Sequence, residues 1–187
     1  MDFVRSAINS HKNSDEYEMA LTAELYDRRQ NKTIMEYQKL LYTISGEAVP
    51  DNYSANYKLT SGLFQRLVIQ QNQYLLGNGV SWNEESTSER LGKDFDNRLQ
   101  EAGHYALVDK VSFGFWNYNH LEVFRLKEFM PLYDEEDGAL KAGIRFWQID
   151  PLKPLRATLY ELDGYTEYIW TRCRCYSRGS MRESFGG

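Results

Sequence analysis

The first half of the chain carries hydrophobic residues at intervals of three or four positions, the spacing that places them on one face of an α-helix. Four such stripes predict four helices between residues 15 and 112. The first helix is expected to begin after Ser14, because serine is a favoured N-cap residue and the acidic residues 15 and 16 suit the positive end of the helix dipole. The stripes are Tyr17, Leu21 and Leu25; Ile34, Tyr37, Leu41 and Ile44, ended by Gly46; Leu59, Leu63, Leu67 and Tyr74; and Leu91, Phe95, Leu99 and Ala102.

The stretch QYLLGNGVSW, residues 73–82, places Gly77 and Gly79 directly after the third stripe. A phosphate-binding loop has its glycines before a helix N-terminus, where amide groups and the positive end of the dipole face the anion. Here the glycines follow a helix, and neither GxxxxGK[ST] nor GxGxxG occurs. We therefore expect a helix that stops with Gly77 in the left-handed conformation, followed by a tight turn and a short strand at residues 80–82.

The fourth helix is expected to begin at Ser86, which forms a capping-box pattern with Glu89. It either ends at Gly103 or is followed by a further helix. Beyond residue 112 the pattern changes to aromatic and β-branched residues separated by polar turns at NYNH (117–120) and DEEDG (134–138), which predicts β-strands. Asp163-Gly164 is expected to form a two-residue type I′ hairpin turn.

Helices followed by an antiparallel β-meander predict an α+β fold. The expected organisation is a flexible N-terminus over residues 1–14, a domain over residues 15–170 and a basic tail over residues 171–187. Within the domain, residues 15–112 are expected to be helical and residues 113–170 to form the meander. The tail holds four arginines and one glutamate and has no apolar periodicity, so we expect it to be disordered or not native to the fold.

The length of 187 residues fits a single domain with a substantial core. A formal net charge of −5 argues against a general nucleic-acid binder, which normally presents a basic face. The chain has no apolar run of 18 residues, so we expect no transmembrane helix and no membrane partner. Its first residues lack the apolar stretch of a signal peptide, so synthesis in the cytosol is expected.

The cysteine, histidine and clustered acidic residues, which often serve in catalysis or metal binding, do not form a recognisable sequence motif. Cys173 and Cys175 are expected to be reduced thiols, since residues two apart are poorly placed for a disulfide. His11, His104 and His120 are far apart in sequence, and the acidic residues 134–137 do not match the spacing of an EF-hand loop. The sequence predicts no catalytic, cofactor-binding or metal-binding residues, no cofactor and no enzyme activity. The alternative is a small hydrolase that uses carboxylates of residues 134–137.

Several segments, taken in order, resemble the portal proteins of tailed bacteriophages, in the branch typical of phages with long, flexible tails. The resemblance covers roughly residues 15–170, and no single motif within it is chemically specific. The segments that carry it are ELYDRRQNKTIMEYQKLLYTISGEAVPDNYSANYKL (24–59), GLFQRLVIQQNQYLLGNGV (62–80), FDNRLQEAGHYALVDKVSFGFWNYN (95–119), PLYDEEDGALKAGIRFWQID (131–150) and LYELDGYTEYIW (159–170).

The resemblance implies a structural role in a ring of subunits at one vertex of the virion capsid. Double-stranded DNA passes non-specifically through such a ring during packaging and ejection. The implied partners are further copies of the subunit, the large terminase, capsid or scaffold proteins, and head-completion proteins that connect the tail. The implied location is the virion, after synthesis in the cytoplasm of the host bacterium.

The matched residues correspond to the N-terminal wing of a portal subunit. The stem, clip and crown that follow in portal proteins have no counterpart here, and the resemblance stops near Trp170. A sheet edge left unpaired after residue 170 would be physically awkward, so we expect a truncated or frame-shifted portal gene from a prophage. The alternative is another non-catalytic structural subunit of a phage head or tail.

Overall fold

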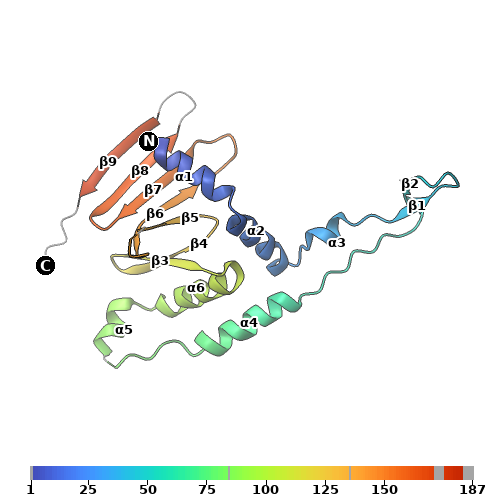
Figure 1. The fold of residues 1–187 in the computed structure, drawn as a ribbon. Coiled ribbons are helices and arrows are strands. Elements are labelled where there is room, and N and C mark those ends of the chain that lie inside the picture. Colours follow the sequence, from blue (N-terminus) through green and yellow to red (C-terminus); the bar gives the residue numbers. More distant parts are fainter. Residues whose placement is uncertain (1, 84, 135, 171–174, 183–187) are drawn as a thin grey trace.

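The computed structural model describes residues 2–83, 85–134, 136–170 and 175–182 and shows an α+β fold, as expected. A five-stranded antiparallel sheet forms one end of the molecule (Figure 1). Its strands follow one another in chain order, so the sheet is a meander. They are β5 (Phe129–Tyr133), β6 (Leu140–Trp147), β7 (Leu155–Glu161), β8 (Gly164–Trp170) and β9 (Cys175–Arg182).

One face of this sheet packs against helix α1 (Asp2–Lys12). Val4 and Ile8 lie four residues apart, so they project from the same side of α1 and enter the core of the molecule. Their buried partners from the sheet are Ile144, Phe146 and Ala157. The prediction of a flexible N-terminus is therefore wrong for residues 2–12, which form this helix. A short apolar stripe, Val4 and Ile8 with Ala7 beside them, holds this helix on the sheet.

Three helices form a lobe on the other side of the molecule: α2 (Asp15–Asp27), α4 (Leu63–Leu76) and α6 (Phe95–Asp109). Helix α6 contacts both α2 and α4, and it also contacts a hairpin made of β3 (Ser112–Asn117) and β4 (His120–Arg125). This hairpin lies between the helical lobe and the sheet (Figure 1). The predicted N-cap is confirmed, because the Oγ of Ser14 accepts a hydrogen bond from the backbone N–H of Tyr17.

The second predicted helix is wrong. Residues 31–62 contain a short helix, α3 (Lys32–Glu36), and a small hairpin of β1 (Leu40–Tyr42) and β2 (Ala48–Pro50). The side chain of Thr43 accepts a hydrogen bond from the backbone N–H of Glu47, and Gly46 has φ +83°. This turn chemistry outweighs the helical spacing of the apolar residues, and it gives a hairpin where a helix was expected.

The region after α4 differs in detail from the prediction. Gly77 is right-handed, with φ −62°, and the left-handed residue is Gly79, with φ +73°. Residues 80–82 are not a strand. The fourth stripe divides into α5 (Glu85–Leu91) and α6 at Gly92, whose φ is +80°, and Ser86 lies inside α5 and not at its N-cap.

Helix α6 continues through Gly103, where the sequence left open either a stop or a second helix. A β-carbon at this glycine would lie 2.5 Å from Oδ1 of Asn72 and 2.7 Å from Cδ1 of Leu76, both on α4. The glycine therefore permits the close approach of α4 and α6, and that packing outweighs its low helix propensity.

The hairpins at NYNH and DEEDG are confirmed by the pairing of β3 with β4 and of β5 with β6. The hairpin near Asp163-Gly164 is also present, but its turn is shifted by one residue. Glu161 pairs with Gly164, so Leu162 and Asp163 form the two-residue connection and Gly164 begins β8. Asp163 does not have the positive φ that a type I′ turn requires at both positions, so that assignment is wrong.

Part of the predicted tail belongs to the sheet. Residues 175–182 form β9, which pairs antiparallel with β8, so the prediction of a disordered tail is wrong for these residues. Since β9 covers the free edge of β8, the physical argument from an unpaired edge after residue 170 does not hold. Residues 171–174 and 183–187, and the predicted thiols of Cys173 and Cys175, lie outside the residues whose side chains are described.

Candidate functional site

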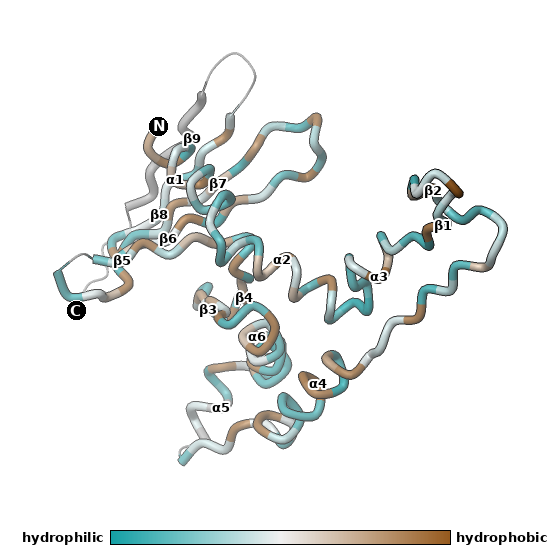
Figure 2. The backbone as a smooth tube through the Cα atoms, turned by 45° about the vertical axis from the view of Figure 1, so that its right-hand side comes forward, coloured by the Kyte–Doolittle hydropathy of each residue, from teal (hydrophilic) through white to brown (hydrophobic). Residues whose placement is uncertain are grey.

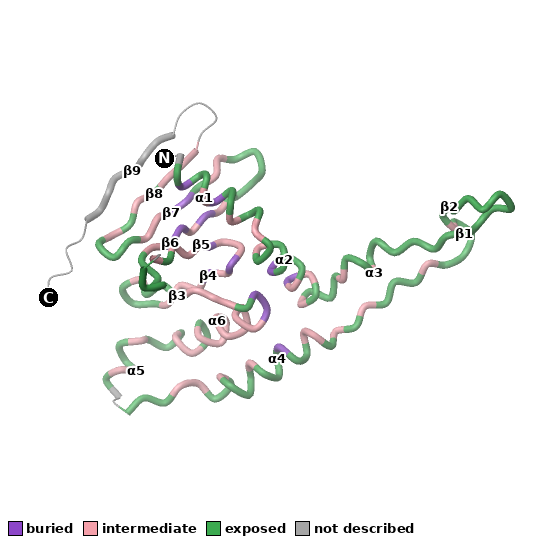
Figure 3. The backbone as a smooth tube through the Cα atoms, in the orientation of Figure 1, coloured by how far each residue is buried: buried purple, intermediate pink, exposed green. Residues whose placement is uncertain are grey.

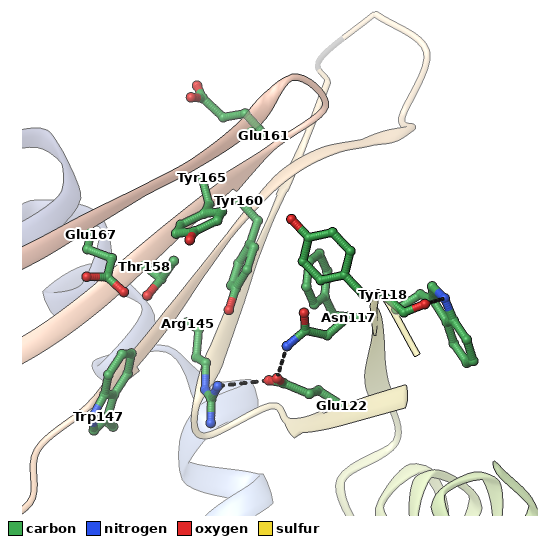
Figure 4. Close-up of a pocket in the computed structure, with 13 residues that line it drawn as sticks. Asn117, Tyr118, Glu122, Arg145, Trp147, Thr158, Tyr160, Glu161, Tyr165 and Glu167 are labelled. Atoms are coloured by element: carbon green, nitrogen blue, oxygen red, sulfur yellow. Dashed lines mark hydrogen bonds and ion pairs between the residues drawn. The ribbon is translucent and has the colours of Figure 1, made fainter. Parts of the chain in front are cut away.

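A pocket of about 550 Å³ opens between the β3–β4 hairpin and the sheet face opposite α1 (Figure 4). The strand register explains its position. Phe129, Arg145, Thr158 and Glu167 form one row across β5, β6, β7 and β8. Because side chains alternate between faces along a strand, this row lies on the opposite face from the core that packs on α1.

Aromatic rings form the walls of this pocket. The rings of Phe115 and Tyr160 are 4.7 Å apart, and those of Tyr160 and Tyr165 are 6.4 Å apart. Thr158, which is only 5% exposed, is the small residue beneath them. The pocket thus exists because a small side chain lies among large ones on the same sheet face.

An ion pair lies at one side of the pocket. Nη1 of Arg145 is 3.1 Å from Oε2 of Glu122, and Nδ2 of Asn117 donates to Oε1 of the same carboxylate at 2.8 Å (Figure 4). The guanidinium of Arg145 also stacks over the ring of Phe124 at 4.4 Å and that of Trp147 at 5.2 Å. Burial raises the pKa of Tyr160 above its ordinary value, although Arg145 acts in the opposite direction.

These groups are suited to recognition. The charge of Arg145 is balanced by Glu122, and the remaining lining is largely aromatic, a combination that binds flat or apolar groups. The sequence did not identify this pocket, because its lining comes from residues 115 to 167 and no local motif joins them.

A second candidate surface is a projecting arm, residues 31–62, which leaves the body between α2 and α4 (Figure 1). No residue in this arm is buried, and most are exposed (Figure 3). Hydrophobic and hydrophilic positions alternate along it (Figure 2). Its exposed large hydrophobic residues are Met35, Tyr37, Leu40, Leu41, Tyr42, Ile44, Val49, Tyr53, Tyr57 and Leu59.

The two sides of the arm are joined by backbone and side-chain hydrogen bonds. The backbone N–H of Asp51 donates to the carbonyl of Lys39 at 2.8 Å, and Nδ2 of Asn56 donates to the carbonyl of Tyr37 at 3.0 Å. The ammonium group of Lys58 donates to the carbonyl of Met35. The arm is therefore a defined structure, although it has no hydrophobic core of its own.

The exposed apolar surface continues from the arm along α4. The sequence predicts one apolar face for this helix, made of Leu59, Leu63, Leu67 and Tyr74 with Phe64, Val68 and Leu75. Val68 is buried and Phe64 is half-buried, while the other five are between 54% and 88% exposed. The helix is thus correctly predicted, but most of its apolar face is directed away from the body of this chain.

A groove of about 630 Å³ lies on α2 where the arm joins the body. Met19, Ala23 and Tyr26 line it from α2, and Phe64 lines it from the first turn of α4. The rings of Tyr26 and Phe64 meet edge to face with centroids 6.4 Å apart. We call this the α2 groove; its remaining lining residues are Asp15, Glu18 and Thr22.

The three histidines remain separate in the structure. His11 Nε2 lies 2.8 Å from the carbonyl oxygen of Leu126, His104 Nε2 lies 3.1 Å from Oδ2 of Asp27, and His120 is beside Glu122. Among the described residues, no group of three or more histidine, cysteine, aspartate or glutamate side chains is arranged to hold a metal ion.

The acidic turn at residues 134–138 does not form a cleft between its carboxylates. Oδ1 of Asp134 accepts from the backbone N–H of Glu136, and Oδ1 of Asp137 accepts from that of Ala139. Lys141 lies 3.1 Å from Asp137 and 3.7 Å from Asp134. These contacts are typical of a solvated turn; Glu135 lies outside the described residues.

A buried ionic network joins the helical lobe to β4. The guanidinium of Arg125 donates to both oxygens of Asp109, at 2.7 and 2.6 Å, and to Glu24 at 3.0 Å. Lys127 donates to Glu24 at 2.9 Å. Burial acts to raise the pKa of Glu24, but the hydrogen bond from Lys127 and the nearby positive charges outweigh it and hold this pKa below its ordinary value.

No protein-family model matches the chain, and no curated protein matches its sequence. Within the described part of the chain, no helix has the length and apolar character needed to cross a membrane.

Proposed function

We propose that this chain is the wing portion of a tailed-phage portal protein, a structural subunit of the ring through which DNA is packaged and ejected. The observation that carries the proposal is the apolar surface that runs from the arm onto the outer side of α4. Soluble monomers rarely expose a large contiguous apolar surface, and such surfaces mark sites of association. A subunit that functions inside an assembly requires such a surface.

The arrangement of the lobe and the sheet supports this proposal over the alternative structural subunits. A helical lobe beside an antiparallel meander fits the wing that the sequence resembles, whereas a closed barrel or a sandwich would favour a different head or tail protein. The carboxylate hydrolase gains no support from residues 134–137, because the carboxylates of Asp134 and Asp137 accept from backbone amides and lie beside Lys141.

As a portal subunit, the chain would associate with further copies of itself and with head-completion and capsid or scaffold proteins. The large terminase would dock on the same ring, and double-stranded DNA would pass through it without sequence-specific contacts. Its location would be the capsid vertex of the virion. The role requires no cofactor and no chemistry of its own.

Immunogold electron microscopy tests this proposal. Antibodies raised against the chain are applied separately to DNA-free heads and to detached tails of the phage that, under this proposal, encodes the chain. Gold at one vertex per head is the expected result. Gold confined to the tails, or gold spread over the whole capsid, would instead identify one of the alternative structural subunits, and heads and tails that carry no gold would reject a virion role.

A further inference from the structure

We propose that the pocket between the β3–β4 hairpin and the sheet binds the guanidinium group of an arginine side chain that another protein presents. The proposal goes beyond the role in a virion and does not depend on it, because it rests only on the groups that line this pocket. Three features carry it: a hydroxyl without a partner at the base, a carboxylate beside that hydroxyl, and aromatic rings with accessible faces.

Thr158 supplies the hydroxyl at the base of the pocket. The residue is only 5% exposed, yet it lines the pocket, and its hydroxyl has no hydrogen-bond partner within the described part of the chain. Buried polar groups in folded proteins are nearly always paired, and an unpaired one costs free energy. A ligand that donates a hydrogen bond to this oxygen therefore gains more than it would at an exposed hydroxyl.

Glu167 supplies a negative charge beside this hydroxyl. It lies opposite Thr158 in the register of β7 and β8, so the two side chains are neighbours on one face of the sheet (Figure 4). None of the described basic side chains forms an ion pair with the carboxylate of Glu167.

The charge of the described lining favours a cation. Glu122 balances Arg145, and the carboxylate of Glu161, at the mouth of the pocket, is directed away from it (Figure 4). The side chains directed inward thus include two carboxylates and one guanidinium, which leaves a net charge of −1. A cleft of one charge sign attracts ligands of the opposite sign, so a cation is favoured over a phosphate or a carboxylate.

Aromatic rings provide the flat surfaces on which a guanidinium stacks. Phe115 is 36% exposed and Tyr165 is 40% exposed, so both can receive a ligand. A guanidinium is planar and weakly hydrated, so it stacks on rings while it donates to a carboxylate, whereas an ammonium is a strongly hydrated point charge. The wall of the pocket already contains this arrangement, because Arg145 stacks over two rings and pairs with a carboxylate.

The rim of the pocket indicates that the guanidinium belongs to a protein. Trp116 and Tyr118 continue the lining along the hairpin and are 39% and 79% exposed. Protein interfaces are rich in tryptophan, tyrosine and arginine, and their binding energy is concentrated where such an anchor fills a pocket. A free small cation would occupy the base alone, whereas residues on either side of an arginine in a peptide would also cover this rim.

Titration of the ¹⁵N-labelled chain, followed by two-dimensional NMR, tests the proposal. The probe is a blocked pentapeptide with a central arginine between glycines. We expect it to shift the amide signals of the β3–β4 hairpin and of β6, β7 and β8, with saturation in the millimolar range. A peptide with citrulline, which has the shape of arginine without its charge, should bind about tenfold more weakly, because hydrogen bonds to charged groups are the stronger ones. Free methylguanidinium should also bind more weakly than the arginine peptide.

Substitutions in the chain locate the contact. Glu167→Gln should weaken binding of the arginine peptide about tenfold. Thr158→Val keeps the shape of the side chain and should weaken binding about threefold, whereas Thr158→Ser keeps the hydroxyl and should retain the affinity. The matched control is Glu161→Gln, which makes the same charge change at a carboxylate directed away from the pocket and should leave the affinity unchanged. Circular dichroism and urea unfolding check that each variant folds.

One residue of β9 requires a separate background. Arg178 lies opposite Glu167 in the register of β8 and β9, and its side chain lies outside those described. The titration is therefore repeated with Arg178→Gln, in which this arginine cannot compete for the carboxylate, and the peptide should bind this variant at least as tightly.

Failure of the arginine peptide to bind saturably in both backgrounds would overturn the proposal. Equal affinity for the citrulline peptide, tighter binding of a peptide with tryptophan in place of arginine, or an equal loss in Glu161→Gln and Glu167→Gln would do the same. Methylguanidinium that binds as tightly as the peptide would reject a protein as the source. Shifts of the pocket signals on addition of the unlabelled chain alone would identify a second copy as the occupant, which also contradicts the proposal.

Discussion

Replacement of Arg125 by methionine should strongly destabilise the chain, because this guanidinium connects three elements. It donates to Asp109 at the end of α6 and to Glu24 of α2, while it belongs to β4. It also stacks over the ring of Tyr105 at 4.8 Å. Methionine keeps much of the side-chain volume, so the substitution removes charge and hydrogen bonds and leaves little empty space.

The magnitude follows from the burial of the carboxylates that remain. The side chain of Asp109 is completely buried, and those of Glu24 and Arg125 are about one-tenth exposed. Removal of one partner from a buried ion pair leaves an uncompensated charge and costs about 3–5 kcal/mol. Glu24 keeps Lys127 and Arg28 as partners, so the unpaired charge of Asp109 accounts for most of the loss.

Urea unfolding followed by circular dichroism measures this cost. With a urea dependence of about 1–3 kcal/mol per molar, the unfolding midpoint should fall by roughly 1 M or more. Asp109→Asn should cost much less in the Arg125→Met background than in the unaltered chain, since it then removes the unpaired charge and breaks no ion pair. The surface pair of Arg98 and Glu101 supplies the control, and Arg98→Met should leave the midpoint nearly unchanged. A loss below about 1 kcal/mol for Arg125→Met would refute the reasoning.

Three further substitutions probe other parts of the fold by urea or thermal unfolding. Gly143→Ala would place a β-carbon 2.0 Å from Cζ of Phe129 and should cost about 1–3 kcal/mol, whereas Gly114→Ala meets only a flexible side chain and should cost less; equal losses would contradict the packing argument. Glu24→Gln should destabilise the chain at pH 7. Folding lowers the pKa of Glu24 below its ordinary value of 4.5, so the ionised carboxylate stabilises the folded chain above that pH. This stabilisation is lost as the pH falls through the lowered pKa, so the variant and the unaltered chain should become equally stable in acid. Ser14→Ala removes an N-cap and should cost about 0.5–2 kcal/mol, and an unchanged melting temperature would argue against that cap.

The sequence predicts the meander well, because alternating strand patterns and turn residues are local signals. The pairing of β3 with β4, β5 with β6 and β7 with β8 follows from them. The turn near Gly164 was misplaced by one residue, since a glycine at the first strand position and one inside the turn have the same sequence signature. The pairing of Glu161 in β7 with Gly164 in β8 shows that the glycine begins the strand.

The spacing of apolar residues gave a wrong prediction in the arm, where these residues are not buried within the chain. Tyr37, Leu41 and Ile44 fit a helical stripe, yet they belong to an arm that buries no residue, so no core selects a helix. The face of α4 that contains Leu63 and Leu67 was predicted correctly as a stripe, yet most of this stripe is exposed in the single chain. The spacing reports that apolar residues share a side, and it does not identify what covers that side.

The site and the ionic network could not be predicted, because their residues meet only through the fold. Arg125 is 16 residues from Asp109 and 101 residues from Glu24 along the chain. Thr158 becomes part of a pocket only because the register places Arg145 and Glu167 on either side of it. Charged and aromatic residues are common in the sequence, so their types alone do not identify these sets.

The packing of α1 has a consequence for how the chain folds during synthesis. Val4 and Ile8 are buried against Ile144, Phe146 and Ala157, so the core joins these two residues of α1 to strand residues that follow them by more than 130 positions in the chain. At roughly 5–20 residues per second, on the order of 10 s pass between the appearance of α1 and that of β7. Contacts of such long sequence separation slow folding. Helix α1 therefore leaves the ribosome well before the sheet on which it packs, and its apolar side stays available to chaperones until that sheet has formed.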